Sequence, residues 1–198
     1  PLGKGADRFR LVCLDTGTTR EGLEHATYPR RRAECERLVE LARRAGFPLG
    51  CLGDAYRQDL HGRIREALAP DHPELCRRLA YLAGAQARLG EMMAAWRRGD
   101  LARVGALFRA DGIGLRDDYR ISGPELESMC DIARTVPGVL GERMLGGGDK
   151  GAAGAIVRRE NVADLERAVA LAWPRSHPEL ADRFAVHACS VVDGVKVT

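Results

Sequence analysis

A glycine-rich segment between two apolar stretches constrains the fold of this chain more than any other feature. Apolar residues at 139–140 precede the segment and others at 155–157 follow it, and both stretches favour strands. The segment spans residues 141–151, and the glycines of its second half are Gly146, Gly147, Gly148 and Gly151. Because glycine has no Cβ, such a loop can adopt positive φ angles and let a ligand approach its backbone closely. The segment therefore predicts two strands joined by a glycine loop.

Two interpretations of this loop remain open from the residues alone. Consecutive backbone N–H groups can converge on an anion, and Lys150 adds a mobile positive charge at the same place. A phosphate-binding loop usually runs from a strand to a helix, however, whereas this one runs from strand to strand. A glycine-rich hairpin turn without a ligand is therefore the structural alternative to a phosphate site.

The composition indicates a globular protein and argues against two classes of partner. With 198 residues, 45% of them hydrophobic, the chain can form one domain with a substantial core, or one domain and part of another. Lys and Arg number 31 and nearly balance the 28 Asp and Glu, so we expect no nucleic-acid partner. No apolar run approaches the roughly 20 residues of a membrane span, so we expect no membrane partner.

The cysteines argue against a metal site. They stand at positions 13, 35, 51, 76, 130 and 189. None forms a Cys-x-x-Cys pair, and no histidine lies at metal-ligand spacing from one of them, so we expect no metal ligands. The pattern suits a reducing compartment, and we expect a cytoplasmic protein.

Hydrophobic periodicity and turn residues predict the order of the secondary structure elements. In chain order we expect a strand over 9–15, helices over 28–45, 64–68, 73–98, 101–111 and 122–136, two strands flanking the glycine loop, a helix after Asn161, a strand over 183–192 and a turn at 193–194. Asp71 and Ser122 each stand three residues before a glutamate, and this capping-box spacing predicts that each caps the helix that follows it. Because strands and helices do not alternate, we predict an α+β fold, a small antiparallel sheet packed with helices.

Four separated blocks of the sequence keep an order and spacing found in one family. Residues 28–36 read Tyr-Pro-Arg-Arg-Arg-Ala-Glu-Cys-Glu, and residues 115–127 begin Leu-Arg-Asp-Asp-Tyr and contain Ser-Gly-Pro-Glu-Leu-Glu. Residues 137–144 lead into the glycine loop, and residues 193–195 read Asp-Gly-Val. These blocks resemble four segments of galactokinases, and the third resembles the third conserved motif of the GHMP kinase superfamily.

The resemblance covers only the second half of a galactokinase-like protein. The family's sugar-binding segment, main phosphate loop and catalytic aspartate belong to its first half, and none of these motifs occurs here. The resemblance therefore implies a GHMP kinase C-terminal domain over residues 28–198. It implies that residues 1–27 are a strand and turn region completing the missing N-terminal domain, and it assigns no catalytic residue to this chain.

The same resemblance implies a function for the full-length protein. It implies an ATP-dependent sugar kinase that uses Mg²⁺ and transfers the γ-phosphoryl group of ATP to a monosaccharide hydroxyl. The missing N-terminal kinase domain, in cis or in trans, would supply the catalytic groups, so we expect this chain alone to be inactive. The residues that the resemblance assigns to the site are Tyr28 beside the sugar and Gly146, Gly147, Gly148, Lys150 and Gly151 in the loop at the nucleotide phosphates. As structural alternatives, Tyr28 packs on the core and Lys150 is an exposed lysine paired with Asp149.

One departure from the family pattern leaves the substrate open. Asp149 and Lys150 stand where galactokinases have Phe-Gly. A kinase for a related sugar, such as arabinose, a uronic acid or a heptose, is therefore an alternative to a galactokinase. A non-catalytic sensor that binds sugar and ATP is a further alternative.

Overall fold

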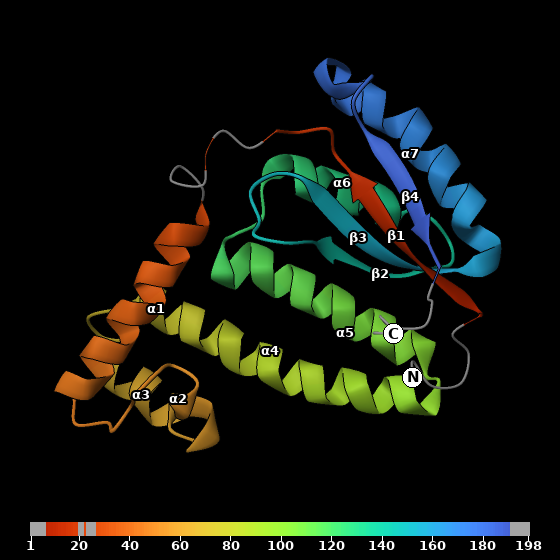
Figure 1. The fold of residues 1–198 in the computed structure, drawn as a ribbon. Coiled ribbons are helices and arrows are strands. Elements are labelled where there is room, and N and C mark those ends of the chain that lie inside the picture. The colour runs from red at the N-terminus through yellow and green to blue at the C-terminus, as the bar shows by residue number, and fades with distance from the viewer. Residues whose placement is uncertain (1–6, 20–21, 23–26, 191–198) are drawn as a thin grey trace, which may run out of the picture.

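The computed structural model describes residues 7–19, 22 and 27–190 (Figure 1). The elements in chain order are β1 (Phe9–Asp15), α1 (Thr27–Arg44), α2 (Asp54–Arg57), α3 (His61–Leu68), α4 (Pro73–Arg98), α5 (Leu101–Gly114), the π-helical turn η1 (Leu115–Tyr119), α6 (Pro124–Arg134), β2 (Val139–Met144), β3 (Ala152–Arg158), the 3₁₀ turn η2 (Arg159–Asn161), α7 (Val162–Ser176), the 3₁₀ turn η3 (Pro178–Leu180) and β4 (Ala185–Cys189). No helix among these residues has the length and apolar character needed to cross a bilayer.

The four strands form one antiparallel sheet in the order β2-β3-β1-β4. The central pair is in register with Val12 opposite Ala155, and Cys13 lies opposite His187 on β4. The register shifts between Val139 and Gly141, near the start of β2. The predicted α+β fold, with a small antiparallel sheet packed against helices, is confirmed.

The position of β1 bears on the expected role of residues 1–27. Both edges of this strand are hydrogen-bonded within the sheet, to β3 on one side and to β4 on the other. The strand Phe9–Asp15 is therefore an internal strand of this sheet, and the expectation that residues 1–27 complete a preceding domain stays a prediction. Residues 1–6, 20–21 and 23–26 lie outside the described residues, and a domain boundary at residue 27 stays a prediction.

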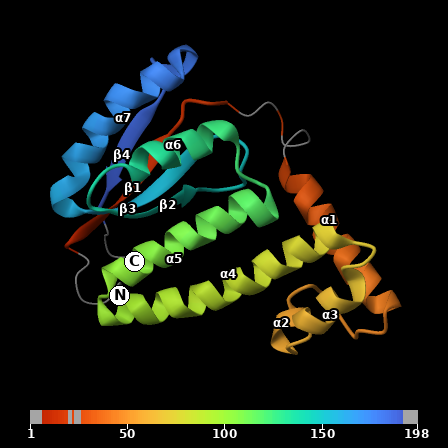
Figure 2. The same cartoon turned by 180° about the vertical axis from the view of Figure 1, so that it is seen from behind.

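Helices pack on both faces of the sheet, but they cover them unequally. Seen from behind in Figure 2, α6 and α7 cover one face, where Val12 and Leu14 pack with the fully buried Trp173. On the opposite face α4 and α5 contact Phe9 and Ile156. On this face α4 and α5 leave β1 and β4 partly uncovered, and Leu11 on β1 is 40% exposed.

A second group of helices lies beside the sheet. Helices α1, α2 and α3 pack on the N-terminal part of α4 around a separate core that includes Leu38, Ile64 and Leu79 (Figure 1). Helix α4 belongs to both cores, because Ala95 near its other end packs with Phe9 of the sheet. This helix therefore joins α1 to the body of the domain.

Two predicted helix caps are wrong. His72, not Asp71, precedes α4, and its side chain makes no capping hydrogen bond. Gly123 precedes α6, and the Ser122 hydroxyl donates instead to Glu127 Oε1 at 2.5 Å. Both helices begin with proline at the first or second position, whose fixed φ favours a helix start and whose missing N–H needs no acceptor. The turn expected at residues 193–194 lies outside the described residues.

A buried carboxylate ties α5 and α6 to β2. The Glu142 side chain is fully buried and accepts hydrogen bonds from Arg109 Nη2 at 2.7 Å and from Arg134 Nε at 2.7 Å. The two guanidinium groups come from α5 and α6, so the charge of Glu142 is compensated from both helices. This cluster fixes the start of the hairpin that carries the glycine loop.

Candidate functional site

The glycine loop, residues 145–151, joins β2 to β3 and contains several residues in the left-handed region. These residues are Gly146 (φ 71°), Gly148 (φ 83°), Asp149 (φ 60°) and Gly151 (φ 103°). The Leu145 amide donates to the Ala152 carbonyl at 2.9 Å, which closes the base of the loop. The predicted hairpin is therefore correct, and its loop has the backbone conformation that favours glycine.

The glycines of this loop have different surroundings. A Cβ at Gly148 would lie 2.0 Å from the Ile121 carbonyl oxygen, whereas a Cβ at Gly146 would meet nothing within 4 Å. Gly146 is exposed, and Gly147 is half-buried. Gly148 therefore serves packing within the protein, while Gly146 leaves its backbone accessible to a ligand.

Residues 121–123 pack directly against the loop. The Asp149 amide donates to the Ile121 carbonyl at 2.8 Å. A Cβ at Gly123 would lie 1.8 Å from the Asp149 carbonyl oxygen, so only glycine fits there without a shift. The segment before α6 thus holds the middle of the glycine loop in place.

Two threonines that follow β1 hold the end of the loop. The Thr16 amide donates to the Gly151 carbonyl at 3.0 Å, and the Gly151 amide donates to Thr18 Oγ1 at 2.9 Å. Thr16 is fully buried. The signal for this contact in the sequence is the two hydroxyl residues that closely follow the strand.

The structure brings Tyr28 close to the glycine loop. The amide of Thr27, the first residue of α1, donates to Asp149 Oδ2 at 2.5 Å. Tyr28 is the next residue and is 52% exposed, so it is not a core residue. Lys150 is also exposed, and the Asp149 carboxylate accepts the hydrogen bond from the first residue of α1.

A cluster of ion pairs holds α1 in this position. Arg31 is buried and donates to the Arg120 carbonyl from Nη2 at 2.9 Å and to Glu34 at 2.5 Å. Arg78 of α4 donates to the same glutamate at 3.1 Å. Partial burial opposes ionisation of Glu34, but hydrogen bonds from Arg31 and Arg78 outweigh it and lower the pKa of this carboxyl. Glu34 is therefore a charged bridge between α1 and α4.

The π-helical turn η1 connects this cluster to the loop. Its last residue, Tyr119, has its hydroxyl 3.6 Å from Cys35 Sγ of α1. The next residue, Arg120, has a left-handed φ of 52°, which turns the chain toward residues 121–123. π-Helical turns within helices occur frequently at functional sites. Residues 119–123 therefore contact α1 through Tyr119 and the glycine loop through Ile121.

Two surface cavities lie elsewhere. One of about 570 Å³ lies between α3 and α4 and is lined in part by Arg65 and Arg77. Another of about 510 Å³ lies along α1 and is lined in part by Arg32 and Arg43. Arg77 and Arg43 already donate to backbone carbonyls, at 3.1 Å and 2.5 Å. We therefore place the candidate site at the glycine loop and the start of α1, where segments far apart in sequence converge.

The described residues contain no group of three or more His, Cys, Asp or Glu side chains that could hold a metal ion. The exposed backbone at Gly146, with Lys150 nearby in the chain, fits an anionic group such as a phosphate.

Comparison with known proteins identifies relatives over most of the chain. No family model matches. The galactokinase of Chloroflexus aurantiacus is 36% identical over 155 residues, which cover 77% of this chain and 38% of the relative. The galactokinase of Enterococcus faecalis is 30% identical over 188 residues, covering 95% and 46%. The human galactokinase is 35% identical over 143 residues, covering 72% and 34%.

A solved structure agrees with these relatives. The structure of Lactococcus lactis galactokinase in complex with galactose matches 93% of this chain and 45% of its own, with a TM-score of 0.78 and 24% identity. The chain spans less than half the length of the curated relatives it matches. The chain is a galactokinase-like member of the GHMP kinase superfamily, and it corresponds to the C-terminal half of that fold.

Proposed function

We propose that the whole protein to which this chain belongs is an ATP-dependent sugar kinase. It transfers the γ-phosphoryl group of ATP to a hydroxyl of a monosaccharide. The observation that carries this proposal is the convergence of Tyr28 and the glycine loop in a chain related to galactokinases. An aromatic side chain suited to a sugar and an open glycine backbone suited to phosphate are the two binding surfaces that such a reaction requires.

Each residue of the site has a distinct proposed role. The Tyr28 ring, about half exposed, packs against the C–H surface of the sugar and offers its hydroxyl for a hydrogen bond. Gly146 and Gly147 let the nucleotide phosphates approach the backbone, and Lys150 adds positive charge beside them. Gly148 and Gly151 hold the loop in shape through the Ile121 and Thr16 contacts.

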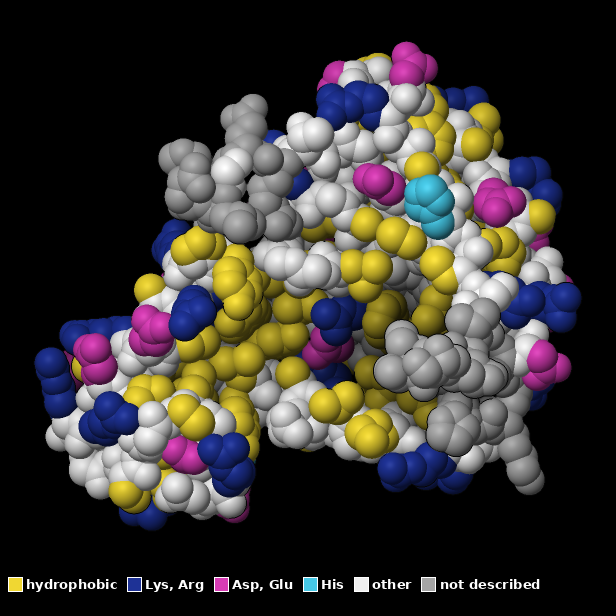
Figure 3. Space-filling model, in the orientation of Figure 1, with side chains coloured by type: hydrophobic (Ala, Val, Ile, Leu, Met, Phe, Trp, Pro, Cys, Tyr) yellow, Lys and Arg dark blue, Asp and Glu magenta, His cyan; other side chains and the backbone are white. Residues whose placement is uncertain are grey.

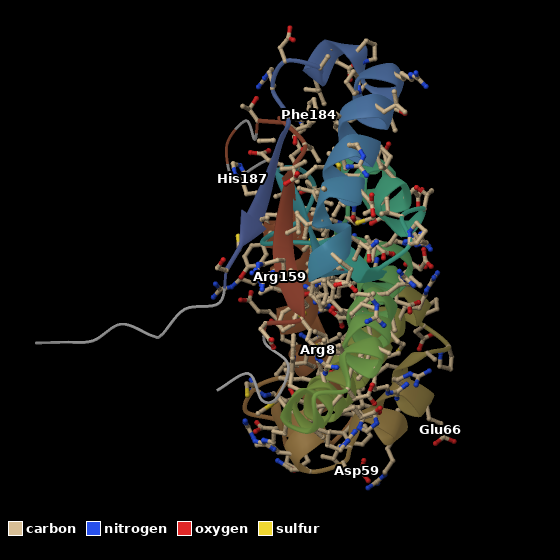
Figure 4. The ribbon with its side chains drawn as sticks, turned by 90° about the vertical axis from the view of Figure 1, so that its right-hand side faces the viewer. Arg8, Asp59, Glu66, Arg159, Phe184 and His187 are labelled. Carbon is tan, nitrogen blue, oxygen red and sulfur yellow. The ribbon has the colours of Figure 1, made fainter. Side chains whose placement is uncertain are left out.

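The catalytic groups come from the missing N-terminal kinase domain, in cis or in trans. Mg²⁺ would neutralise charge on the transferred phosphoryl group, with ligands from that domain. An open face of the sheet supports such a partner: Leu11 lies opposite Cys189, both are exposed, and His187 (labelled in Figure 4) lies on the side away from α7. Figure 3 shows hydrophobic side chains gathered across the middle of the face that carries the sheet.

The substrate is galactose or a related sugar. Family membership favours galactose. The exposed Lys150 favours the alternative of an acidic sugar such as a uronic acid, because a carboxylate would pair with its ammonium group. Arabinose and a heptose remain further alternatives, and we expect the enzyme to act in the cytoplasm.

A kinase assay on the whole protein tests the proposal. ADP release with ATP and Mg²⁺ is measured for galactose, arabinose, galacturonic acid and a heptose, with the parent and with Lys150→Gly. Turnover of at least one sugar supports the kinase. A preference for the uronic acid that Lys150→Gly removes supports the acidic substrate, whereas an unchanged ranking led by galactose supports a galactokinase. Sugar and ATP binding without turnover would replace the kinase with a sensor.

The chain of residues 1–198 serves as the matched control in this assay. We expect it to show no sugar phosphorylation, because the resemblance places the main phosphate loop and the catalytic aspartate in the other half. Phosphorylation by this chain alone would show that the N-terminal domain is not required.

A further inference from the structure

We propose that Asp149 is a positioning residue that fixes the start of α1, and with it Tyr28, on the glycine loop. The inference deepens the proposed function, because it rests on Tyr28 as the sugar contact. It gives a role to one of the two residues at which the glycine loop departs from the galactokinase pattern. In this role the Asp149 carboxylate does not face the substrate, but acts through the helix that carries Tyr28.

The first turn of α1 lacks the negative charge that a helix start favours. It contains no acidic residue, and Arg30 follows closely. The free N–H groups and the partial positive charge of a helix N-terminus are stabilised by an acceptor, best by a carboxylate. Asp149 Oδ2 accepts from the Thr27 amide, so the acceptor comes from a loop 122 residues away in sequence.

Asp149 itself is held rigidly enough to position a helix. Its amide donates to the Ile121 carbonyl at 2.8 Å, and its carbonyl oxygen lies against Gly123. Its φ of 60° lies in the left-handed region, which Asp and Asn tolerate better than most residues. The backbone of Asp149 is therefore fixed by residues 121–123, and its side chain transmits that position to α1.

The remainder of α1 is held independently of this cap. Arg31 donates to the Arg120 carbonyl from Nε at 3.2 Å and from Nη2 at 2.9 Å. Arg78 reaches α1 through Glu34. Loss of the Asp149 carboxylate should therefore release only the first turn, where Tyr28 lies, and leave the helix folded.

Two substitutions at position 149 separate the cap from the backbone conformation. Asp149→Asn keeps an acceptor oxygen and tolerates the left-handed φ. Asp149→Gly removes the acceptor, and glycine adopts this φ without strain. Asp100→Ala is the matched control, because Asp100 caps α5 by accepting from the Arg103 amide at 3.0 Å, outside the candidate site.

Amide hydrogen exchange of the 198-residue chain tests the cap without any activity. We expect Asp149→Gly to raise exchange at the Thr27 amide about tenfold, the effect of losing a typical helix cap, and Asp149→Asn to stay close to the parent. Asp100→Ala should raise exchange at Arg103 but not at Thr27. Unchanged exchange at Thr27 in Asp149→Gly would overturn the proposal.

Kinetics of the whole protein test the consequence for the sugar. We expect Asp149→Gly to raise the sugar KM about tenfold, because the competent position of Tyr28 becomes less populated, with less than about a threefold change in the ATP KM. Asp149→Asn should keep the sugar KM close to that of the parent, and Asp100→Ala should leave it unchanged. Faster exchange with an unchanged sugar KM would overturn the positioning role. If the parent phosphorylates no sugar, the proposed function fails, and the exchange experiment still decides whether Asp149 caps α1.

Discussion

Replacing Gly148 by alanine should destabilise the domain far more than the same change at Gly146, two residues earlier. Both glycines have positive φ angles, 83° and 71°. They differ in what an added methyl group would meet, because a Cβ at Gly148 would lie 2.0 Å from the Ile121 carbonyl oxygen and a Cβ at Gly146 would meet nothing within 4 Å. The pair therefore separates the cost of the backbone conformation from the cost of the close contact.

The magnitude follows from these two costs. The left-handed conformation costs about 1–2 kcal/mol for a residue with a Cβ, and this cost applies to both variants. At Gly148 the contact must also be relieved by moving backbone, which overpacking studies place at about 1–3 kcal/mol. Moving Ile121 away weakens its hydrogen bond from the Asp149 amide, about 1 kcal/mol more. We therefore expect Gly148→Ala to be less stable than Gly146→Ala by about 2–4 kcal/mol.

Urea and thermal unfolding of the two variants measure this difference. For a domain of this size, 2–4 kcal/mol corresponds to a separation of roughly 5–15 °C in Tm. Far-ultraviolet circular dichroism at low temperature checks that both variants fold. Equal stability of the two variants would show that the loop does not pack on Ile121 as described, and it would refute the distinction between a packing glycine and a ligand-facing glycine.

Three further predictions concern charges and thiols in the same chain. Hydrogen bonds from the Cys51 amide, the Arg57 side chain and the Gly50 amide lower the pKa of Asp54 from 3.8 to about 2. The contribution of this carboxylate to stability is therefore present above about pH 4 and is lost as the pH falls towards 2. The difference in stability between the parent and Asp54→Asn, measured by urea unfolding, should close over that range. Burial, with the nearby carboxylates, raises the pKa of the Cys130 thiol to about 12, so mass spectrometry should find it unmodified by iodoacetamide at pH 8 in the folded chain. Arg109→Ala should cost about 2–4 kcal/mol in urea unfolding, because it leaves the buried Glu142 carboxylate with less compensation.

Two of these predictions have an internal control. Arg103→Ala breaks an ion pair with Glu91 in which both side chains are about half exposed, and it should cost less than about 1 kcal/mol. A loss as large as that of Arg109→Ala would remove burial as the reason. Cys189 is exposed and should be alkylated under conditions that spare Cys130. A pH-independent gap for Asp54→Asn would contradict the hydrogen bonds to that carboxylate.

The sequence was sufficient for elements whose signal is local. The strand Phe9–Asp15, the long helix ending before Gly99 and the two strands around the glycine loop all lie where their patterns predicted them. These signals are hydrophobic periodicity and a left-handed glycine at a helix end, with φ 71° at Gly99, and they need no knowledge of the tertiary structure.

Local signals were misleading where tertiary packing decided the outcome. Helix α5 was expected to end at Asp111 and Gly112, but it continues to Gly114. A Cβ at Gly112 would lie 2.6 Å from Arg143 Cβ, and a Cβ at Gly105 would lie 2.4 Å from Leu140 Cβ. These glycines therefore allow α5 to approach β2 closely, and a glycine that serves helix–sheet packing cannot be distinguished by sequence from one that ends a helix.

The sequence suggested residues for the candidate site, whose roles stay predictions, but it did not predict the contacts that bring these residues together. The blocks suggested Tyr28 and the glycine loop, but the contacts that bring them together join backbone to side chain: Arg31 to the Arg120 carbonyl and Thr27 to the Asp149 carboxylate. Nearly every residue supplies a backbone donor and a backbone acceptor, so the sequence does not indicate which of them a side chain will bind. Within the first block, Arg31 therefore holds α1 against the segment that packs on the glycine loop. The Arg31 guanidinium group is buried and donates to Glu34 and to the Arg120 carbonyl. Substitutions at Arg31 should therefore act on the site through the position of α1.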